Sequence, residues 1–465
     1  MRRLAMNSSK TLAMLEQWEF PTDFFDAPHP RPAEWPDDPQ LRRAVDWFKS
    51  FMSPQQWIER REKAARRLYA GALGIKVGDG RFFDSKDGFG WYLFLAEAML
   101  DHIGNYDYLY GARVVPIFLA IGRDLHLLKE VDGVESRVAR MVGKERGQPN
   151  GGLFELLVAA CYARAGAKVA FAEERPGQAQ TYDMDITLNG RTWAVECKRM
   201  EVGEYSESER LQIGRLWSGC SMLLGTLEQN TLCKVSFKVE LKTVPDDYLM
   251  TKVIEWMDSG FKNIGWSDAT ADGSICVLDL RPLRQVLATD MVLGSSHRIT
   301  ELLTGNYVRN AQYQTKLRIK RGDNPRYVDD CDLAIVLHWE SLSDAATASK
   351  ARDVRKKLSE ATAQLPEGRP SIIHVGFEAV EGDSVERVRH SKILATAGQF
   401  DPGKKQLEYV YCHYFVPESP PDESWAFDET TQWCGIRHSQ PRPLKKCFLV
   451  LPEDAHTRPG PHWQG

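Results

Sequence analysis

The chain has 465 residues, of which 43% are hydrophobic and 27% charged, and its formal net charge is -4. This length suits two or three domains with a large buried core, and the composition is that of a globular protein rather than a disordered or fibrous one. The charge excludes a dedicated, strongly basic nucleic-acid binder, although a local basic cleft is compatible with it.

Cysteine usage indicates the cellular compartment. Nine cysteines are scattered along the chain and none forms a Cys-x-x-Cys pair, which predicts reduced thiols and a cytoplasmic location. Cys412, His413, Cys434, His438 and Cys447 form the one group that resembles a zinc site. Their spacing matches no common zinc pattern, so we interpret them as dispersed core residues.

No apolar run reaches membrane-spanning length, and we expect no membrane contact.

The first region, residues 1–148, opens with a segment rich in proline, aspartate and tryptophan, which predicts an extended arm. A helical pattern follows from about residue 40. The expected helices are Leu41 to Phe51, Pro54 to Leu73, Trp91 to Ile103 and Tyr110 to Leu128. We therefore expect a helical N-terminal domain that ends before the Pro-Asn-Gly-Gly joint at 149–152.

The second region, residues 149–245, opens with an apolar helix that carries a single acid, Glu155. After it, the pattern predicts three strands, a helix and a fourth strand. These are Lys168 to Glu174, Asp183 to Leu188, Thr192 to Met200, Ser206 to Leu227 and Cys233 to Leu241. Asn189-Gly190 is a two-residue hairpin signal between the second and third strands. This hairpin is expected to bring Asp185 near Glu196.

Charged residues on the third strand share one face. Glu196 and Lys198 alternate with the apolar Val195 and Cys197, so the carboxylate and the amine point the same way. Hard cations such as Mg2+ prefer carboxylate oxygens, and such a cation activates water and stabilises charge on phosphate. The pattern therefore predicts a divalent-metal site on Asp185 and Glu196, with Lys198 beside the attacking water or the phosphate.

This pattern resembles the PD-(D/E)xK nuclease superfamily, and its resolvase and Mrr-like branches in particular. The residues that carry the resemblance are Glu155, Asp185, Glu196 and Lys198, together with the element order. Met184 stands where the family name has proline. The resemblance implies an α/β fold with a restriction-endonuclease-like αβββαβ core. It also implies that Glu155, Asp185 and Glu196 hold Mg2+ or Mn2+, and that the substrate is nucleic acid, DNA rather than RNA, in restriction, repair or defence.

Several alternatives stand beside this interpretation. Glu196 and Lys198 would form a solvated ion pair on a surface strand, and Glu155 would be an early-helix glutamate favoured by the helix dipole. Asp183 shares a face with Asp185 and is the alternative ligand; we prefer Asp185 because the Ile-Thr-Leu that follows it matches the family pattern. At the level of function, the alternatives are an inactive nuclease-fold module that binds nucleic acid or protein, and an assembly subunit that pairs with itself or a partner protein.

The third region, residues 246–465, alternates strand and helix patterns and predicts mixed α/β structure, either extending the nuclease sheet or folding separately. The expected strands are Ser274 to Leu280, Cys331 to His338, Ser371 to Glu378, Glu408 to Phe415 and Lys446 to Leu451. The expected helices are Asp246 to Ser259, Ser343 to Gln364 and Asp383 to Leu394. Two basic runs, Lys316 to Arg321 and Lys350 to Lys357, are candidates for nucleic-acid contact but are more often solvated faces.

Overall fold

A computed structural model describes most of the chain. The described residues are 17–27, 37–72, 83–173, 181–201, 203–294, 296–309, 311–321, 326–352, 354–445 and 447–464. Much of the proline-rich arm expected at the start lies outside them. No helix in these ranges is both long enough and apolar enough to cross a membrane.

The N-terminal region is helical, as the sequence predicts. Its helices are α2 (Pro39–Lys49), α3 (Pro54–Ala72), α4 (Gly88–Asp101), α5 (Tyr108–Arg123), α6 (Leu125–Leu128) and α7 (Val134–Val142). The carboxylate of Asp38 caps α2 by accepting hydrogen bonds from the backbone N–H groups of Gln40 and Leu41. Apolar side chains from these helices form one core with the next helix, α8 (Asn150–Arg164). The helical region is therefore packed directly against the sheet that follows.

The first sheet contains six strands in the order β1-β2-β3-β10-β11-β12. Their bounds are β1 (Lys168–Phe171), β2 (Met184–Leu188), β3 (Arg191–Met200), β10 (Pro370–Glu378), β11 (Gln406–Glu418) and β12 (Ala426–Gly435). The three central strands β3, β10 and β11 are parallel, and the remaining pairs are antiparallel. The C-terminal region therefore contributes half of the strands in this sheet.

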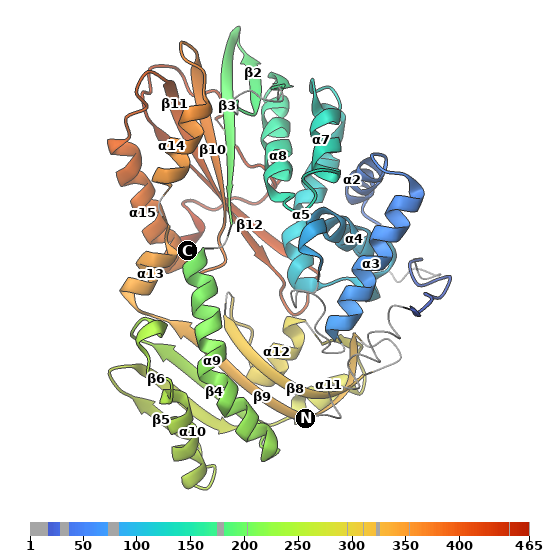
Figure 1. Cartoon of the computed structure of the whole chain (residues 1–465), viewed down its shortest axis with the longest axis vertical. Helices are drawn as coiled ribbons and strands as arrows, with labels where there is room; N and C mark the ends of the chain where they lie inside the picture. Colours follow the sequence, from blue (N-terminus) through green and yellow to red (C-terminus); the bar gives the residue numbers. More distant parts are fainter. Residues whose placement is uncertain are drawn as a thin grey trace.

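Helices cover both faces of the first sheet, as Figure 1 shows. On one face, α8 packs against Trp193, Val195 and Cys197 of β3. On the other, α14 (Arg355–Gln364) and α15 (Asp383–Gln399) pack against Ala194 and the apolar residues of β10 and β11. Both faces of the sheet are buried, which is the usual arrangement for parallel strands. The chain is thus a mixed α/β protein.

A second sheet is built from the middle of the chain. Its strands run in the order β5-β6-β4-β9-β7, and β8 also pairs with β9. They are β4 (Thr231–Phe237), β5 (Ile264–Ser267), β6 (Ala271–Val277), β7 (Val292–Leu293), β8 (Gln312–Arg321) and β9 (Tyr327–Ser341). Helices α9 (Glu204–Thr226) and α10 (Tyr248–Asp258) cover one face. Helices α11 (Arg281–Leu287) and α12 (His297–Thr304) cover the other.

The expected fourth strand of the core forms in this second sheet. The segment predicted at Cys233 to Leu241 is β4, which pairs with β6 and β9 rather than with β3. The cause is the length of α9, whose 23 residues span roughly 35 Å and carry the chain away from the first sheet. The parallel neighbour of β3 is instead β10, nearly 170 residues further along.

Two further expectations in the C-terminal region need correction. The helix predicted from Ser343 to Gln364 is divided into α13 (Asp344–Lys350) and α14. The strand predicted from Lys446 to Leu451 does not appear among its described residues. The backbone N–H groups of Leu449 and Val450 donate to the Glu429 carboxylate at 2.8 and 2.9 Å, so a buried side chain takes the place of a neighbouring strand.

Candidate active site

The β2–β3 hairpin sets the positions of the acidic residues. Asn189 and Gly190 both have positive φ, 52° and 72°, as the predicted two-residue turn requires. The resulting register pairs Asp185 with Ala194 and Met184 with Val195. One step further from the turn, the backbone N–H of Asp183 donates to the Val195 carbonyl at 3.0 Å. Asp183, rather than Asp185, therefore lies beside Glu196.

The Asp183 carboxylate is held at the end of β2. Its Oδ2 accepts the backbone N–H of Cys197 at 2.6 Å, and its side chain is hydrogen-bonded to Glu196. Burial, followed by the nearby carboxylates of Glu155 and Glu196, raises the pKa of Asp183 well above its usual range. Two carboxylates that share a buried position cannot both ionise freely, so they hold a proton or require a cation.

Glu196 is fully buried, with 0% of its surface exposed. Burial raises its pKa to about 7, although the neighbouring Lys198 ammonium acts in the opposite direction. The Lys198 amine donates to Glu196 Oε1, and to Gln364 Oε1 of α14 at 3.3 Å. Burial by itself would lower the pKa of Lys198, but the attraction of Glu196 and then Asp183 raises it. Lys198 therefore stays charged beside the paired acids.

Glu155 borders the same cluster from α8. Its charge raises the pKa values of both Asp183 and Glu196. The neighbouring Phe154 fixes the helix against β10, because a Cβ atom at Gly376 would lie 2.8 Å from the Phe154 ring. The Glu155 carboxylate is bound by Arg137 of α7, which donates from Nε to Oε2 and from Nη2 to Oε1, the latter at 2.9 Å. Glu155 is thus an ion-paired neighbour of the other two acids.

Asp185 lies apart from this cluster. Its Oδ1 accepts a hydrogen bond from Arg369 Nη2 at 2.7 Å, and 37% of its side chain is exposed. The hairpin register explains the difference, because Asp185 is two residues closer to the turn than Asp183 and faces Ala194. The sequence preference for Asp185 over Asp183 rested on the residues that follow, whereas the strand register brings Asp183 to Glu196. We therefore take Asp183 as the strand aspartate of the candidate site.

Sequence reasoning missed two residues that complete the cluster. Gln364 reaches Lys198 from the end of α14, and Arg137 holds Glu155 from α7. No local pattern marks either residue. Only the parallel pairing of β3 with β10 brings α14, which immediately precedes β10, to this position.

Comparisons with protein-family models, with curated proteins and with solved structures found no match to this chain.

The donor set determines which cation fits. Within the described ranges, no group of three or more histidine, cysteine, aspartate or glutamate side chains is arranged to hold a metal ion. Asp183 and Glu196 nevertheless supply two carboxylates for a hard cation such as Mg2+, which commonly uses one or two carboxylates and keeps several waters. Burial raises the pKa of the Cys197 thiol well above its usual range, so this group stays protonated and is a poor ligand. Glu155 joins such a site only if Arg137 releases it.

Proposed function

We propose that this protein is a metal-dependent nuclease that hydrolyses phosphodiester bonds, in DNA rather than RNA. The observation that carries the proposal is the pair of hydrogen-bonded, buried carboxylates of Asp183 and Glu196, with the Lys198 ammonium beside them. Their raised pKa values express an electrostatic cost that a divalent cation would remove. This is the chemistry expected of a cation site rather than of a solvated ion pair.

Each residue has a distinct part in this proposal. Asp183 and Glu196 would hold Mg2+ or Mn2+, which when bound supplies Lewis-acid stabilisation of charge on the phosphate and makes water more acidic. Lys198, held between Glu196 and Gln364, would place its positive charge at the scissile phosphate or orient the attacking water. Glu155, on α8, would raise the pKa values of Asp183 and Glu196 through its negative charge.

The topology supports the finer fold assignment. If residues 204–341 are counted as an insertion, the remaining elements run α8, β1, β2, β3, α14 and β10, with α13 as an additional short helix. This is the helix, three strands, helix, strand order of the restriction-endonuclease-like core. We therefore infer such a core, interrupted between β3 and α14, in place of the continuous core at residues 149–245 that the sequence suggests.

A digest of defined nucleic acids tests this function. The full-length protein should cleave single- or double-stranded DNA in Mg2+ or Mn2+ and not in EDTA, with RNA of the same sequence as the comparison. Glu196→Gln should abolish cleavage, and Asp185→Asn serves as the matched control because it removes a carboxylate from the same hairpin. Cleavage that persists in Glu196→Gln, or that ignores EDTA, would exclude the proposed site.

A nuclease-fold module that binds nucleic acid without cleaving it is the second candidate. The observation in its favour is that Glu155 and Glu196 have cationic partners within the chain itself, Arg137 and Lys198. Such a protein would retain metal-independent DNA binding and show no cleavage in any of the conditions above.

A further inference from the structure

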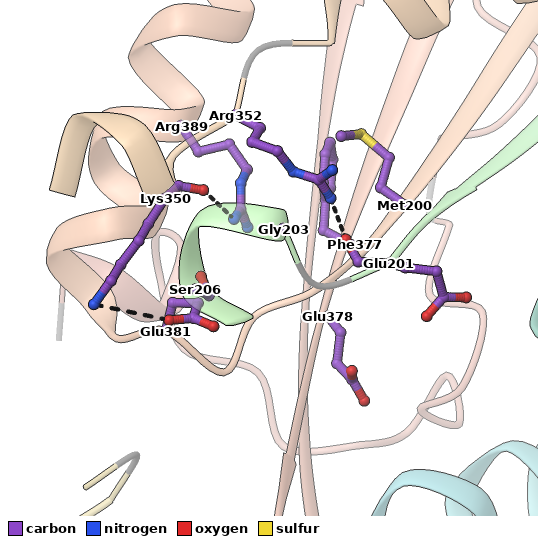
Figure 2. A pocket seen from close by; sticks show the side chains of 10 residues that line it. All are labelled: Met200, Glu201, Gly203, Ser206, Lys350, Arg352, Phe377, Glu378, Glu381 and Arg389. Atoms are coloured by element: carbon purple, nitrogen blue, oxygen red, sulfur yellow. Dashed lines mark hydrogen bonds and ion pairs between the residues drawn. The ribbon is translucent and has the colours of Figure 1, made fainter. Parts of the chain in front are cut away.

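A small, partly open pocket lies beyond the carboxyl ends of β3 and β10. Figure 2 shows that it lies where the chain leaves β3 through Glu201 and Gly203 to start α9, beside Arg352 at the chain's return to the first sheet. Ligands in α/β proteins commonly bind outside the carboxyl ends of parallel strands. The pocket therefore occupies a favourable position for a ligand, at the connection between the two sheets.

Arg352 and Arg389 both line this pocket, and no carboxylate in the described residues forms ion pairs with both. Arg352 donates to the backbone carbonyl of Glu201, and no carboxylate in the described part of the chain forms an ion pair with it. Burial and then the nearby Arg389 charge lower the pKa of Arg352, although the charges of Glu204 and Glu201 act in the opposite direction. Arg389 is bound to Glu386 and to the Lys350 carbonyl, and its buried Nε has no hydrogen-bond partner among the described residues. Only 8% of the Arg389 side chain is exposed.

The start of α9 adds backbone donors to this pocket. Gly203 is the N-cap, with no side-chain cap, and both Gly203 and Ser206 line the pocket. A Cβ atom at position 203 would lie 3.1 Å from Arg352 Nε, so glycine lets the guanidinium lie close against the helix start. The first backbone N–H groups of a long helix attract anions. Arg352 and the start of α9 thus favour negative charge at the same place.

Acidic residues of the pocket have side-chain partners other than Arg352. Glu201 accepts from Asn150 Nδ2 at 2.8 Å, and Glu378 pairs with Arg113 at 3.4 Å. Figure 2 shows both carboxylates pointing away from the guanidinium of Arg352. Glu381 approaches Lys350 at 4.0 Å and Arg210 at 3.6 Å. In the described part of the chain none of these carboxylates forms an ion pair with Arg352, so its guanidinium can still pair with an external anion.

We propose that this pocket binds a phosphate group, held by Arg352, the unpaired Nε of Arg389 and the start of α9. A guanidinium pairs with phosphate oxygens through two parallel hydrogen bonds, which suits this ligand better than a halide. The group comes either from a small phosphate ester or from the phosphorylated end of a nucleic-acid strand. Glu201 directly follows β3, three residues beyond Lys198 and roughly 10 Å away. The site does not depend on the nuclease proposal, because binding requires no cleavage.

Calorimetric titration of the full-length protein tests this site. The probes are inorganic phosphate, a nucleoside 5′-monophosphate, and a short oligonucleotide with either a 5′-phosphate or a 5′-hydroxyl, all in EDTA and at an ionic strength fixed with chloride. The variants are Arg352→Gln, which keeps a donor for the Glu201 carbonyl, and Gly203→Ala, which displaces the guanidinium. Arg215→Gln is the control, because Arg215 pairs with Asp246 on the exposed side of α9.

Saturable binding of one phosphate group is expected, weakened about tenfold or more by Arg352→Gln and unchanged by Arg215→Gln. Similar affinity for inorganic phosphate and the nucleotide indicates a small ester as ligand, whereas binding only of the 5′-phosphorylated oligonucleotide indicates a strand end. If circular dichroism shows that Arg352→Gln is unfolded, the affinity of Gly203→Ala for the same probes decides whether this pocket binds phosphate. No saturable binding of any probe, or binding that the folded pocket variants leave intact, overturns the proposal.

Discussion

Replacing Glu196 by glutamine should make the metal-free β2–β3 hairpin more stable at high pH and leave it unchanged at low pH. Folding raises the pKa of Glu196 from 4.5 to about 7, with burial as the main cause. The folded protein therefore binds this proton more tightly than the unfolded chain. The resulting stabilisation is complete below about pH 4.5 and is lost as the pH rises through about 7.

The structure gives the size of this effect. At about 1.4 kcal/mol per pKa unit, the charged carboxylate costs about 3 kcal/mol once it is fully ionised. Glutamine has nearly the same shape and no charge, so Glu196→Gln should remove that cost at pH 8.5. Protection of the hairpin amides, residues 181–201, should then rise on the order of 100-fold. At about pH 4, below both pKa values, the side chain is mostly protonated in the folded and the unfolded chain, so the two proteins should differ little.

Hydrogen exchange of peptides from this hairpin measures the difference directly, because it reports local opening in a chain with two sheets. The measurement is made in EDTA and corrected for the intrinsic pH dependence of exchange. Asp185→Asn is the control: it loses only a half-exposed ion pair with Arg369, worth about 0–1 kcal/mol. An effect of Glu196→Gln that is destabilising, or equal at the two pH values, would refute the electrostatic description of this site.

Three further outcomes follow from the geometry. Asp183→Asn and Lys198→Ala should each reduce DNA cleavage at least 100-fold, whereas Asp185→Asn should retain most of it, as initial rates with Mg2+ will show. In differential scanning fluorimetry, saturating Mn2+ at about a hundredfold excess over its Kd should stabilise the wild type by about 2.7 kcal/mol, and Asp183→Asn should not respond. Arg137→Met should destabilise the metal-free protein by about 3 kcal/mol in urea titrations, because it leaves the mostly buried Glu155 without its partner; an unchanged midpoint would contradict this.

Local patterns in the sequence predicted most of the elements near the site. Alternation placed Glu196 and Lys198 on one face of β3, and Asn189-Gly190 gave the hairpin turn that the structure contains. These features depend on neighbouring residues only, so periodicity and turn chemistry were sufficient to find them.

The choice between Asp183 and Asp185 was beyond the sequence. Both residues share a strand face, and side-chain alternation cannot separate them. The hairpin register separates them, because it pairs Asp185 with Ala194, whereas Asp183 is hydrogen-bonded to Glu196 and accepts the Cys197 N–H. Register depends on the turn and on the whole pairing of two strands, which a motif of a few residues does not contain.

The neighbour of β3 was also beyond local reasoning. The segment at β4 has the apolar alternation of a core strand, and nothing in it distinguishes one sheet from another. In the second sheet β4 pairs with β9 and buries its apolar side chains against α9 and α10, while β10 supplies the parallel partner of β3 from a distant part of the chain. Long-range pairing of this kind also brings Gln364 to Lys198.

The most direct test of the central claim is a matched pair of cleavage assays. Asp183→Asn and Asp185→Asn make the same chemical change two residues apart on one hairpin, and each is compared with the wild type on a DNA substrate in Mg2+, in Mn2+ and in EDTA. The account predicts metal-dependent cleavage by the wild type and Asp185→Asn, and none by Asp183→Asn. Cleavage by Asp183→Asn at the wild-type rate, or wild-type cleavage that persists in EDTA, would contradict it.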